Sequence, residues 1–148
     1  MTVARRLERG SVLILVPATV LVLLVLGAIA VDSSVAYLAR RQLADFTASA
    51  ADQAAAAALD KPAFYSSGQL RIDPNAAQLV VAAAESAARR DGLDITSVNV
   101  SVGPTGRSVT VAASATARTV FGLAVGGRRV FTVRASTTTD VTEVSATP

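Results

Sequence analysis

The chain has 148 residues, of which 51% are apolar and 17% charged, and its formal net charge is +3. It contains neither His nor Cys, which excludes disulfides, Cys/His zinc sites, thiol nucleophiles and every mechanism that needs an imidazole. The mean hydropathy of +0.47 is high for a soluble domain, and the apolar residues are concentrated near the N-terminus.

Residues 11–31 read SVLILVPATVLVLLVLGAIAV and are predicted to form a transmembrane helix. A helix of this length spans about 32 Å, which matches a hydrocarbon core of ~30 Å. Pro17 lies one to two turns inside, where a membrane helix tolerates it. The predicted membrane-boundary residues are Arg5, Arg6, Arg9 and Asp32. The arginines that precede the apolar run predict that residues 1–10 are cytoplasmic and that the rest of the chain is extracytoplasmic.

A cleaved signal peptide is the alternative interpretation of the same segment. Ala28-Ile29-Ala30 has the A-x-A pattern of a signal-peptidase site. The apolar run is longer than the usual hydrophobic region of such a peptide, ~7–15 residues. Either interpretation exports the C-terminal part of the chain.

Residues 32–60 are predicted to continue as an Ala-rich extracytoplasmic helix, because residues 33–60 contain neither Gly nor Pro. Pro62 excludes Lys61 from the helical region and ends the helix. Apolar residues at three- and four-residue steps form one stripe, the candidate helix interface: Ala39, Leu43, Phe46, Ala50, Ala54 and Ala57. Arg41, Asp45, Thr47 and Asp52 are predicted to lie largely on other faces. Small side chains favour close packing against another helix or a sheet; a stalk without a partner is the alternative.

Residues 61–148 are predicted to form a small α+β head. Residues 63–72 have the composition of a loop or short strand with a turn at Ser67-Gly68. Asp73 and Pro74 then have the pattern of a helix N-cap followed by proline in the first turn. The helix that follows should end at Asp91-Gly92.

The rest of the chain has the period of β-structure. Valines at 98, 100 and 102, a turn at 103–106, and apolar residues alternating over 109–117 predict a β-hairpin with one buried face. An apolar insert at 118–127 precedes a strand within 128–144, and the Thr-rich end, 136–148, is predicted to be an edge strand or tail. The fold class is therefore α+β: a long N-terminal transmembrane and Ala-rich helix, then a small helix and an antiparallel sheet.

Nothing in the sequence predicts catalysis, a cofactor or a small-molecule substrate. Asp45 and Asp52 lie two helical turns apart, too far to share a metal ion without other ligands. The arginine pairs are scattered and lack interleaved aromatics, which argues against a nucleic-acid surface. Asp32 is expected to cap exposed backbone at the membrane interface rather than to contact a partner.

The N-terminal region resembles the TadE-like and TadG-like proteins of the tight-adherence (Tad, Flp) pilus assembly system. The similarity rests on Arg9-Gly10 before the apolar run, Val31-Asp32 after it, the segment YLARRQL at 37–43 and the Ala-rich stretch. It covers residues 8–58 well and residues 95–136 loosely. Prepilins of type IV systems carry a Glu five residues after the processing Gly, whereas this chain has Leu15 there, so the resemblance favours an unprocessed TadG-like accessory protein.

The resemblance implies a pilin-like fold and a non-catalytic, single-pass component of a Tad/Flp-type pilus assembly or export apparatus in a bacterial cell envelope. Its partners would be membrane lipid and other pilus assembly proteins or pilin-like subunits. The alternative is a membrane-anchored or secreted adaptor module unrelated to pili. Whether the N-terminal segment is cleaved after Gly10 or after Ala30 stays open at this point.

Overall fold

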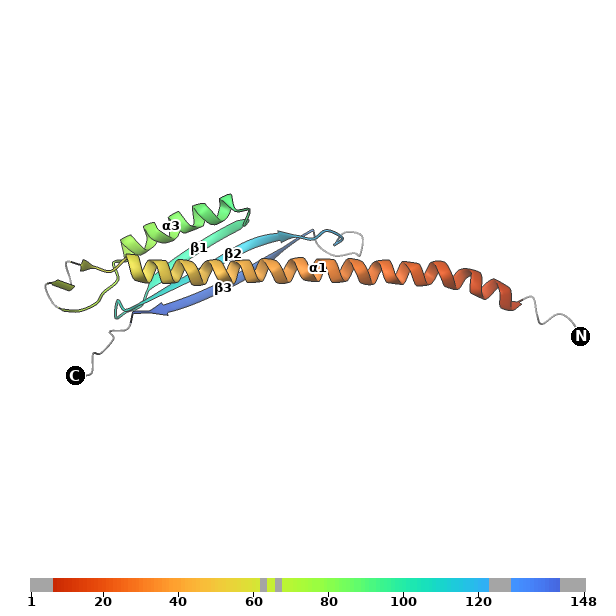
Figure 1. Cartoon of the computed structure of the whole chain (residues 1–148), viewed down its shortest axis with the longest axis horizontal. Helices are drawn as coiled ribbons and strands as arrows, with labels where there is room; N and C mark the ends of the chain where they lie inside the picture. The colour runs from red at the N-terminus through yellow and green to blue at the C-terminus, as the bar shows by residue number, and fades with distance from the viewer. Residues whose placement is uncertain (1–6, 62–63, 66–67, 123–128, 142–148) are drawn as a thin grey trace, which may run out of the picture.

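The computed structural model describes residues 7–61, 64–65, 68–122 and 129–141, with side chains from residue 15 onward (Figure 1). The longest element is α1, Leu7–Ala57, a single helix of 51 residues and about 77 Å. The predicted apolar and Ala-rich helices are therefore one helix, and it continues through Pro17. It extends far beyond the rest of the chain (Figure 1).

The helix α1 ends three residues before the predicted end at residue 60. The N–H of Ala58 still donates to the carbonyl of Ala54, at 3.0 Å. Leu59 then forms an isolated antiparallel bridge with Ile72, and the N–H of Asp60 donates to the carbonyl of Arg71 at 2.8 Å. This pairing with a later segment takes the chain out of the helix before Pro62 does.

The second described helix, α3, spans Pro74–Arg90 and confirms the predicted helix. The side chain of Asp73 accepts a hydrogen bond from the N–H of Asn75 at 2.9 Å, and Pro74 occupies the first turn. At the other end Gly92 has a φ of +90°, a left-handed conformation that glycine adopts without steric cost.

Three strands form one antiparallel sheet in the order β1-β2-β3: β1 Ile95–Val102, β2 Ser108–Arg118 and β3 Val130–Asp140. The predicted hairpin is confirmed, with Gly106 at a φ of +69° in its turn. A register shift between Ile95 and Ser97 reverses the alternation, so Ile95 is buried although it is out of phase with Val98. That bulge explains why the regular pattern in the sequence begins only at Val98.

The last strand is shorter than the predicted range 128–144. It spans Val130–Asp140, and the N–H of Val141 donates to the carbonyl of Arg107 at 2.7 Å beyond it. It lies at an edge of the sheet, so residues 136–140 follow the edge-strand alternative of the prediction for the Thr-rich end. Most of the predicted insert and the end of the Thr-rich tail, residues 123–128 and 142–148, lie outside the described residues.

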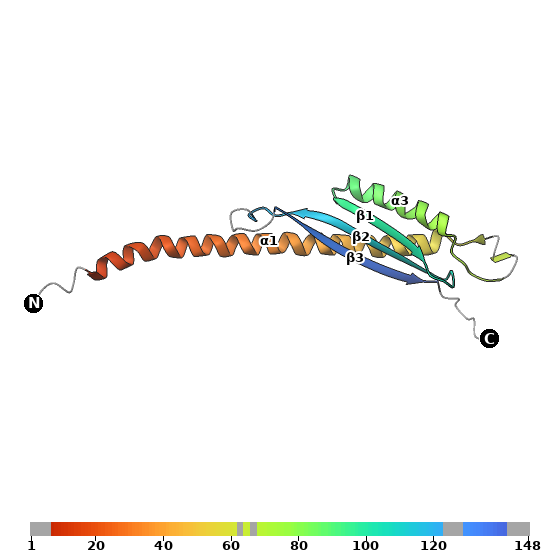
Figure 2. The same cartoon turned by 180° about the vertical axis from the view of Figure 1, so that it is seen from behind.

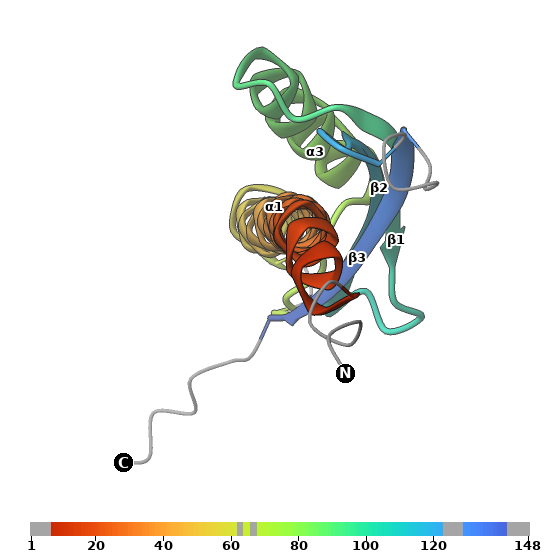
Figure 3. The same cartoon turned by 90° about the vertical axis from the view of Figure 1, so that its right-hand side faces the viewer.

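The head has two layers, with both helices on the same face of the sheet (Figures 2 and 3). The helix α1 packs against β2 and β3, whereas α3 packs against β1 and against α1. The opposite face carries Ser, Thr and Asn side chains, among them Thr110 and Thr138, whose hydroxyls lie 2.8 Å apart. The sheet therefore has one apolar and one polar face, as its alternation predicts.

The core contains many small side chains. One cluster joins the C-terminal part of α1 to α3 and β2; its buried members are Ala50, Ala51, Ala54, Ala58, Ile72, Ala77, Val81, Val109 and Val111. The other joins α1 to β2 and β3 through Leu43, Ala113, Ala115 and Val133. Phe46 packs against both clusters. Residues of the predicted extracytoplasmic helix and of the predicted head thus share one interior.

The N-terminal half of α1 has the opposite character. Large apolar side chains are exposed all along it, with Leu21 and Leu24 at 64% and 66%. Of the described helices, α1 is the one long and apolar enough to cross a membrane, and none of its most apolar window is buried within the chain. This part of α1 is compatible with a single-pass membrane anchor.

Candidate helix interface and membrane boundary

The predicted interface stripe faces the interior of the head. Leu43, Ala50 and Ala54 are fully buried, and Ala39 and Phe46 are half-buried. Ala57, the last residue of α1, is exposed and lies off the buried face. The stripe is therefore covered by the chain's own sheet and by α3 rather than left free for another molecule.

The buried face of α1 is wider than the stripe predicted from the sequence. Ala51 and Ala55 are also buried, as is Ala58 directly after the end of the helix. So is Thr47, which has no exposed surface, and the prediction that it lies on another face is wrong. The reason is that α1 has two neighbours: the sheet covers one side of the helix and α3 covers an adjacent side (Figure 3).

Two side-chain hydrogen bonds join α1 to the Thr-rich half of β3. The hydroxyls of Thr47 and Thr137 lie 3.0 Å apart, and the hydroxyl of Thr47 also donates to the carbonyl of Ala44 at 3.0 Å. The hydroxyl of Thr139 donates to Oδ1 of Asp52 at 2.8 Å. Beyond Ala135 the inward-facing residues of β3 are threonines, and these bonds give their hydroxyls partners where α1 covers them.

The sequence held a signal for these polar contacts. Thr137 and Thr139 continue the two-residue period of Phe131, Val133 and Ala135, which predicts that they point to the same face of the sheet. The inward-facing position of Thr137 and Thr139 is not predicted from their residue type, because a Thr-rich end is also typical of an exposed tail.

Asp32 receives two hydrogen bonds from the segment that follows β2. Its Oδ1 accepts from the backbone N–H of Val120 at 2.8 Å and from that of Phe121 at 3.1 Å. A carboxylate that accepts two backbone N–H groups is a charge-assisted cap. Asp32 was expected to cap exposed backbone, but the segment that supplies the backbone lies 88 residues away and no sequence spacing indicates it.

The other predicted boundary residues are the three arginines that precede the apolar run. Arg5 and Arg6 lie outside the described residues, and so does the side chain of Arg9. Beyond Asp32, the side chains of Arg40 and Arg41 are exposed.

A groove of about 500 Å³ separates α1 from the C-terminal half of α3. Polar residues of α1 form one wall and alanines of α3 the other: Gln42, Asp45, Ser49 and Gln53 face Ala84, Ala87 and Ala88. Within the polar wall, Nε2 of Gln53 donates to Oγ of Ser49 at 2.9 Å. Among the described residues, no group of three or more His, Cys, Asp and Glu residues is placed to hold a metal ion.

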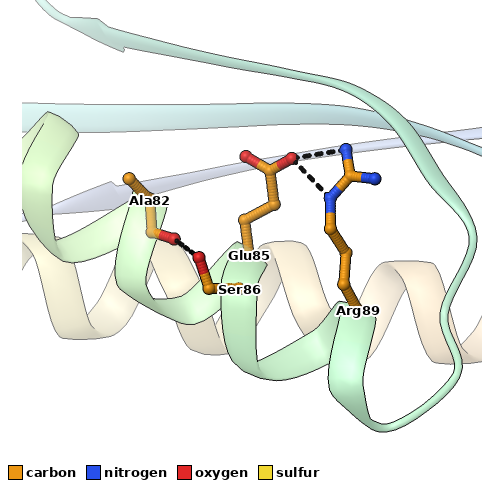
Figure 4. Close-up of polar contacts among 4 residues, drawn as sticks. All are labelled: Ala82, Glu85, Ser86 and Arg89. Carbon is orange, nitrogen blue, oxygen red and sulfur yellow. Dashed lines mark hydrogen bonds and ion pairs between the residues drawn. The ribbon is translucent and has the colours of Figure 1, made fainter.

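The polar contacts of α3 in Figure 4 are local to that helix. Nε and Nη2 of Arg89 donate to Oε1 of Glu85 at 3.0 and 2.8 Å, and the hydroxyl of Ser86 donates to the carbonyl of Ala82 at 2.9 Å. A partly exposed pair of this spacing contributes about 0.3–0.5 kcal/mol to helix stability. It supports α3 and has no direct part in the interface.

Comparison with family models, with curated proteins and with solved structures found no match for the chain. Its function is therefore inferred from its residues and their contacts.

Proposed function

We propose that the protein is a non-catalytic, membrane-anchored component of a Tad/Flp-type pilus assembly or export apparatus. The observation that carries the proposal is the continuity of α1. The same helix supplies an exposed apolar segment, Leu15 to Val31, and the buried face between Leu43 and Ala55 that packs on the sheet and α3. A head joined to a membrane helix without a linker is held at a fixed distance along that helix from the bilayer, which suits a structural part of an assembly.

Two further features support the proposal. The helix packed on an antiparallel sheet is a pilin-like arrangement, and residues 8–58 resemble the TadE-like and TadG-like proteins. The stripe within α1 supports the head rather than a partner, because Ala50 and Ala54 are fully buried by the chain itself. Partner contacts would then use exposed surfaces such as the groove between α1 and α3.

We further propose that the N-terminus is cytoplasmic and the head extracytoplasmic. The three arginines that precede the apolar run support this orientation, since short cytoplasmic segments are enriched in Arg and Lys. The absence of cysteine makes the test simple. In intact spheroplasts a membrane-impermeant maleimide should label Tyr65→Cys, whose parent side chain is 84% exposed.

Thr2→Cys should be labelled only after the cells are lysed. The reverse pattern would contradict the orientation. A soluble mature protein that starts at Val31 would favour the secreted alternative.

The assembly role is tested by deleting the gene in its own host and measuring filament subunit on the cell surface. We expect surface filament to be lost while the cellular amount of subunit is unchanged, and the wild-type gene to restore it. Unchanged surface filament would contradict the pilus proposal and leave the adaptor alternative.

A matched pair of variants sharpens the same experiment. Ser49→Arg places a cation in the groove, whereas Ala56→Arg places one on an exposed part of α1 that does not line it. At matched abundance, loss of surface filament with Ser49→Arg alone would locate an assembly contact in the groove. Ala50→Arg is unsuitable for this purpose, because a buried cation would unfold the head.

A further inference from the structure

One end of the sheet carries large apolar side chains that the described part of the head leaves partly exposed. Val120 and Phe121 follow β2 and are 64% and 42% exposed. Val130, the first residue of β3, is 43% exposed. This is the end of the sheet that reaches along α1 toward its N-terminal half (Figures 1 and 2).

The hydrogen bonds to Asp32 set the depth of these residues along α1. Asp32 is the first charged residue after the apolar run 11–31, so it marks the point at which that run meets the membrane surface. Val120 and Phe121 donate to its carboxylate at 2.8 and 3.1 Å, and they therefore lie at the same level. Exposed apolar residues occur where the hydrocarbon of a bilayer would end.

Positively charged side chains gather just above that level. Arg118 pairs with Val130 across the sheet, and Arg129 precedes Val130 in the chain. Arg40 of α1 lines a shallow hollow together with Val130. The three arginine side chains are exposed, and none forms an ion pair with another described residue. Val120 and Phe121 below and arginines above match a phospholipid surface, with acyl chains below the phosphates.

We infer that this end of the sheet is a second membrane contact. Val120 and Phe121 enter the boundary between headgroups and acyl chains, and Arg40, Arg118 and Arg129 lie at the level of the phosphates. The contact rests on the proposed membrane anchoring of α1 and adds to it. A single helix leaves its head free to rotate and tilt, whereas a second contact beside it holds one face of the head toward the bilayer.

The experiment uses the natural absence of tryptophan, which makes each introduced Trp the sole Trp emitter. Phe121→Trp, Leu24→Trp and Tyr65→Trp are compared in the full-length protein, reconstituted into phosphatidylglycerol-containing vesicles. The vesicles carry bromine on the acyl chains, either near the headgroup or near the chain end. Leu24 lies within the apolar run, and Tyr65 lies beyond the opposite end of α1.

We expect Phe121→Trp to lose emission with bromine near the headgroup and to lose less with bromine near the chain end. Leu24→Trp should be quenched strongly by the deeper bromine, and Tyr65→Trp by neither. Val120→Trp serves as a second probe of the same contact and should behave like Phe121→Trp.

Two failures are distinguishable. If Leu24→Trp is not quenched, the membrane anchor itself is wrong, and the second contact fails with it. If Leu24→Trp is quenched while Phe121→Trp and Val120→Trp behave like Tyr65→Trp, the anchor stands and the second contact is overturned. In that case the exposed apolar end of the sheet faces water or a protein partner.

Discussion

The two halves of α1 belong to one helix, yet the N-terminal half exposes large apolar side chains and the C-terminal half buries small ones. From residue 15 to residue 38 the large Leu and Val side chains are mostly exposed. From residue 39 to residue 58 the buried residues are mainly alanines, with Leu43 and Thr47 as the larger exceptions. The two parts therefore differ in two ways: the lipid-compatible part, residues 15–31, is uncharged and built of large apolar side chains, whereas the part that packs on protein has small buried side chains and polar residues such as Arg41 and Asp45 on its exposed faces.

Small side chains suit the C-terminal half because two elements approach it closely. The sheet and α3 both contact this part of α1, and alanine lets their backbones come near. Large side chains suit the N-terminal half because they cover the helix backbone with apolar surface on every side.

The largest effect should come from removing α1. Residues 61–148 alone would expose the sheet face that carries Val109, Val111 and Val133, all buried beneath α1 or beside it. We expect this fragment not to fold, whereas residues 33–148 fold with a cooperative thermal transition followed by circular dichroism. A cooperative transition at the same temperature in both fragments would contradict the shared core.

The same substitution in the two halves should have different effects. Leu43 has no exposed surface, and Leu43→Ala should lower the free energy of unfolding of the head by about 2–5 kcal/mol. Leu23 is 63% exposed, and Leu23→Ala should change the free energy of unfolding of the head by less than about 0.5 kcal/mol. Denaturant titration of both variants in the same detergent measures the difference. Equal losses would mean that the N-terminal half also packs against the head.

The hydroxyl pair between α1 and β3 should show coupling. Thr47→Val removes one partner of the bond to Thr137 and should cost about 1 kcal/mol of stability, and Thr137→Val should cost a similar amount. The double variant should lose less free energy of unfolding than the two single variants lose together, because it leaves no unpaired hydroxyl. Strictly additive losses in the double-mutant cycle would show that the two hydroxyls act independently.

The smallest and most local effect is expected at Asp32. Asp32→Ala removes the acceptor of two backbone N–H groups. We expect this loss to lower the free energy of local opening of the segment after β2 by about 1.5 kcal/mol. Amide hydrogen exchange at Val120 and Phe121 should then accelerate about tenfold, with no change in the melting temperature of the head. Asp32→Asn keeps a side-chain oxygen and is the matched control, with a smaller acceleration. Unchanged exchange in Asp32→Ala would show that another group holds the segment after β2.

Much of the secondary structure could be predicted because its signals are local. The uncharged run at 11–31, the cap formed by Asp73 and Pro74, and the alternation over 109–117 each depend on residues close in the chain. The candidate site was predicted less completely. The three- and four-residue spacing identified Leu43, Ala50 and Ala54, but it also included the exposed Ala57 and left out the buried Thr47.

The sequence by itself determined that the chain has one long apolar helix, a small α+β head, and neither the imidazole nor the thiol that many catalytic and metal sites require. Only the tertiary structure decided which face of that helix is buried, because the width of the face depends on two neighbours, the sheet and α3, that come later in the chain. Only the tertiary structure brought Asp32 to Val120 and Phe121, 88 and 89 residues away. The periodicity of a segment indicates that one of its faces is apolar, but it does not indicate which later elements cover that face. A contact between distant residues depends on how the elements pack together.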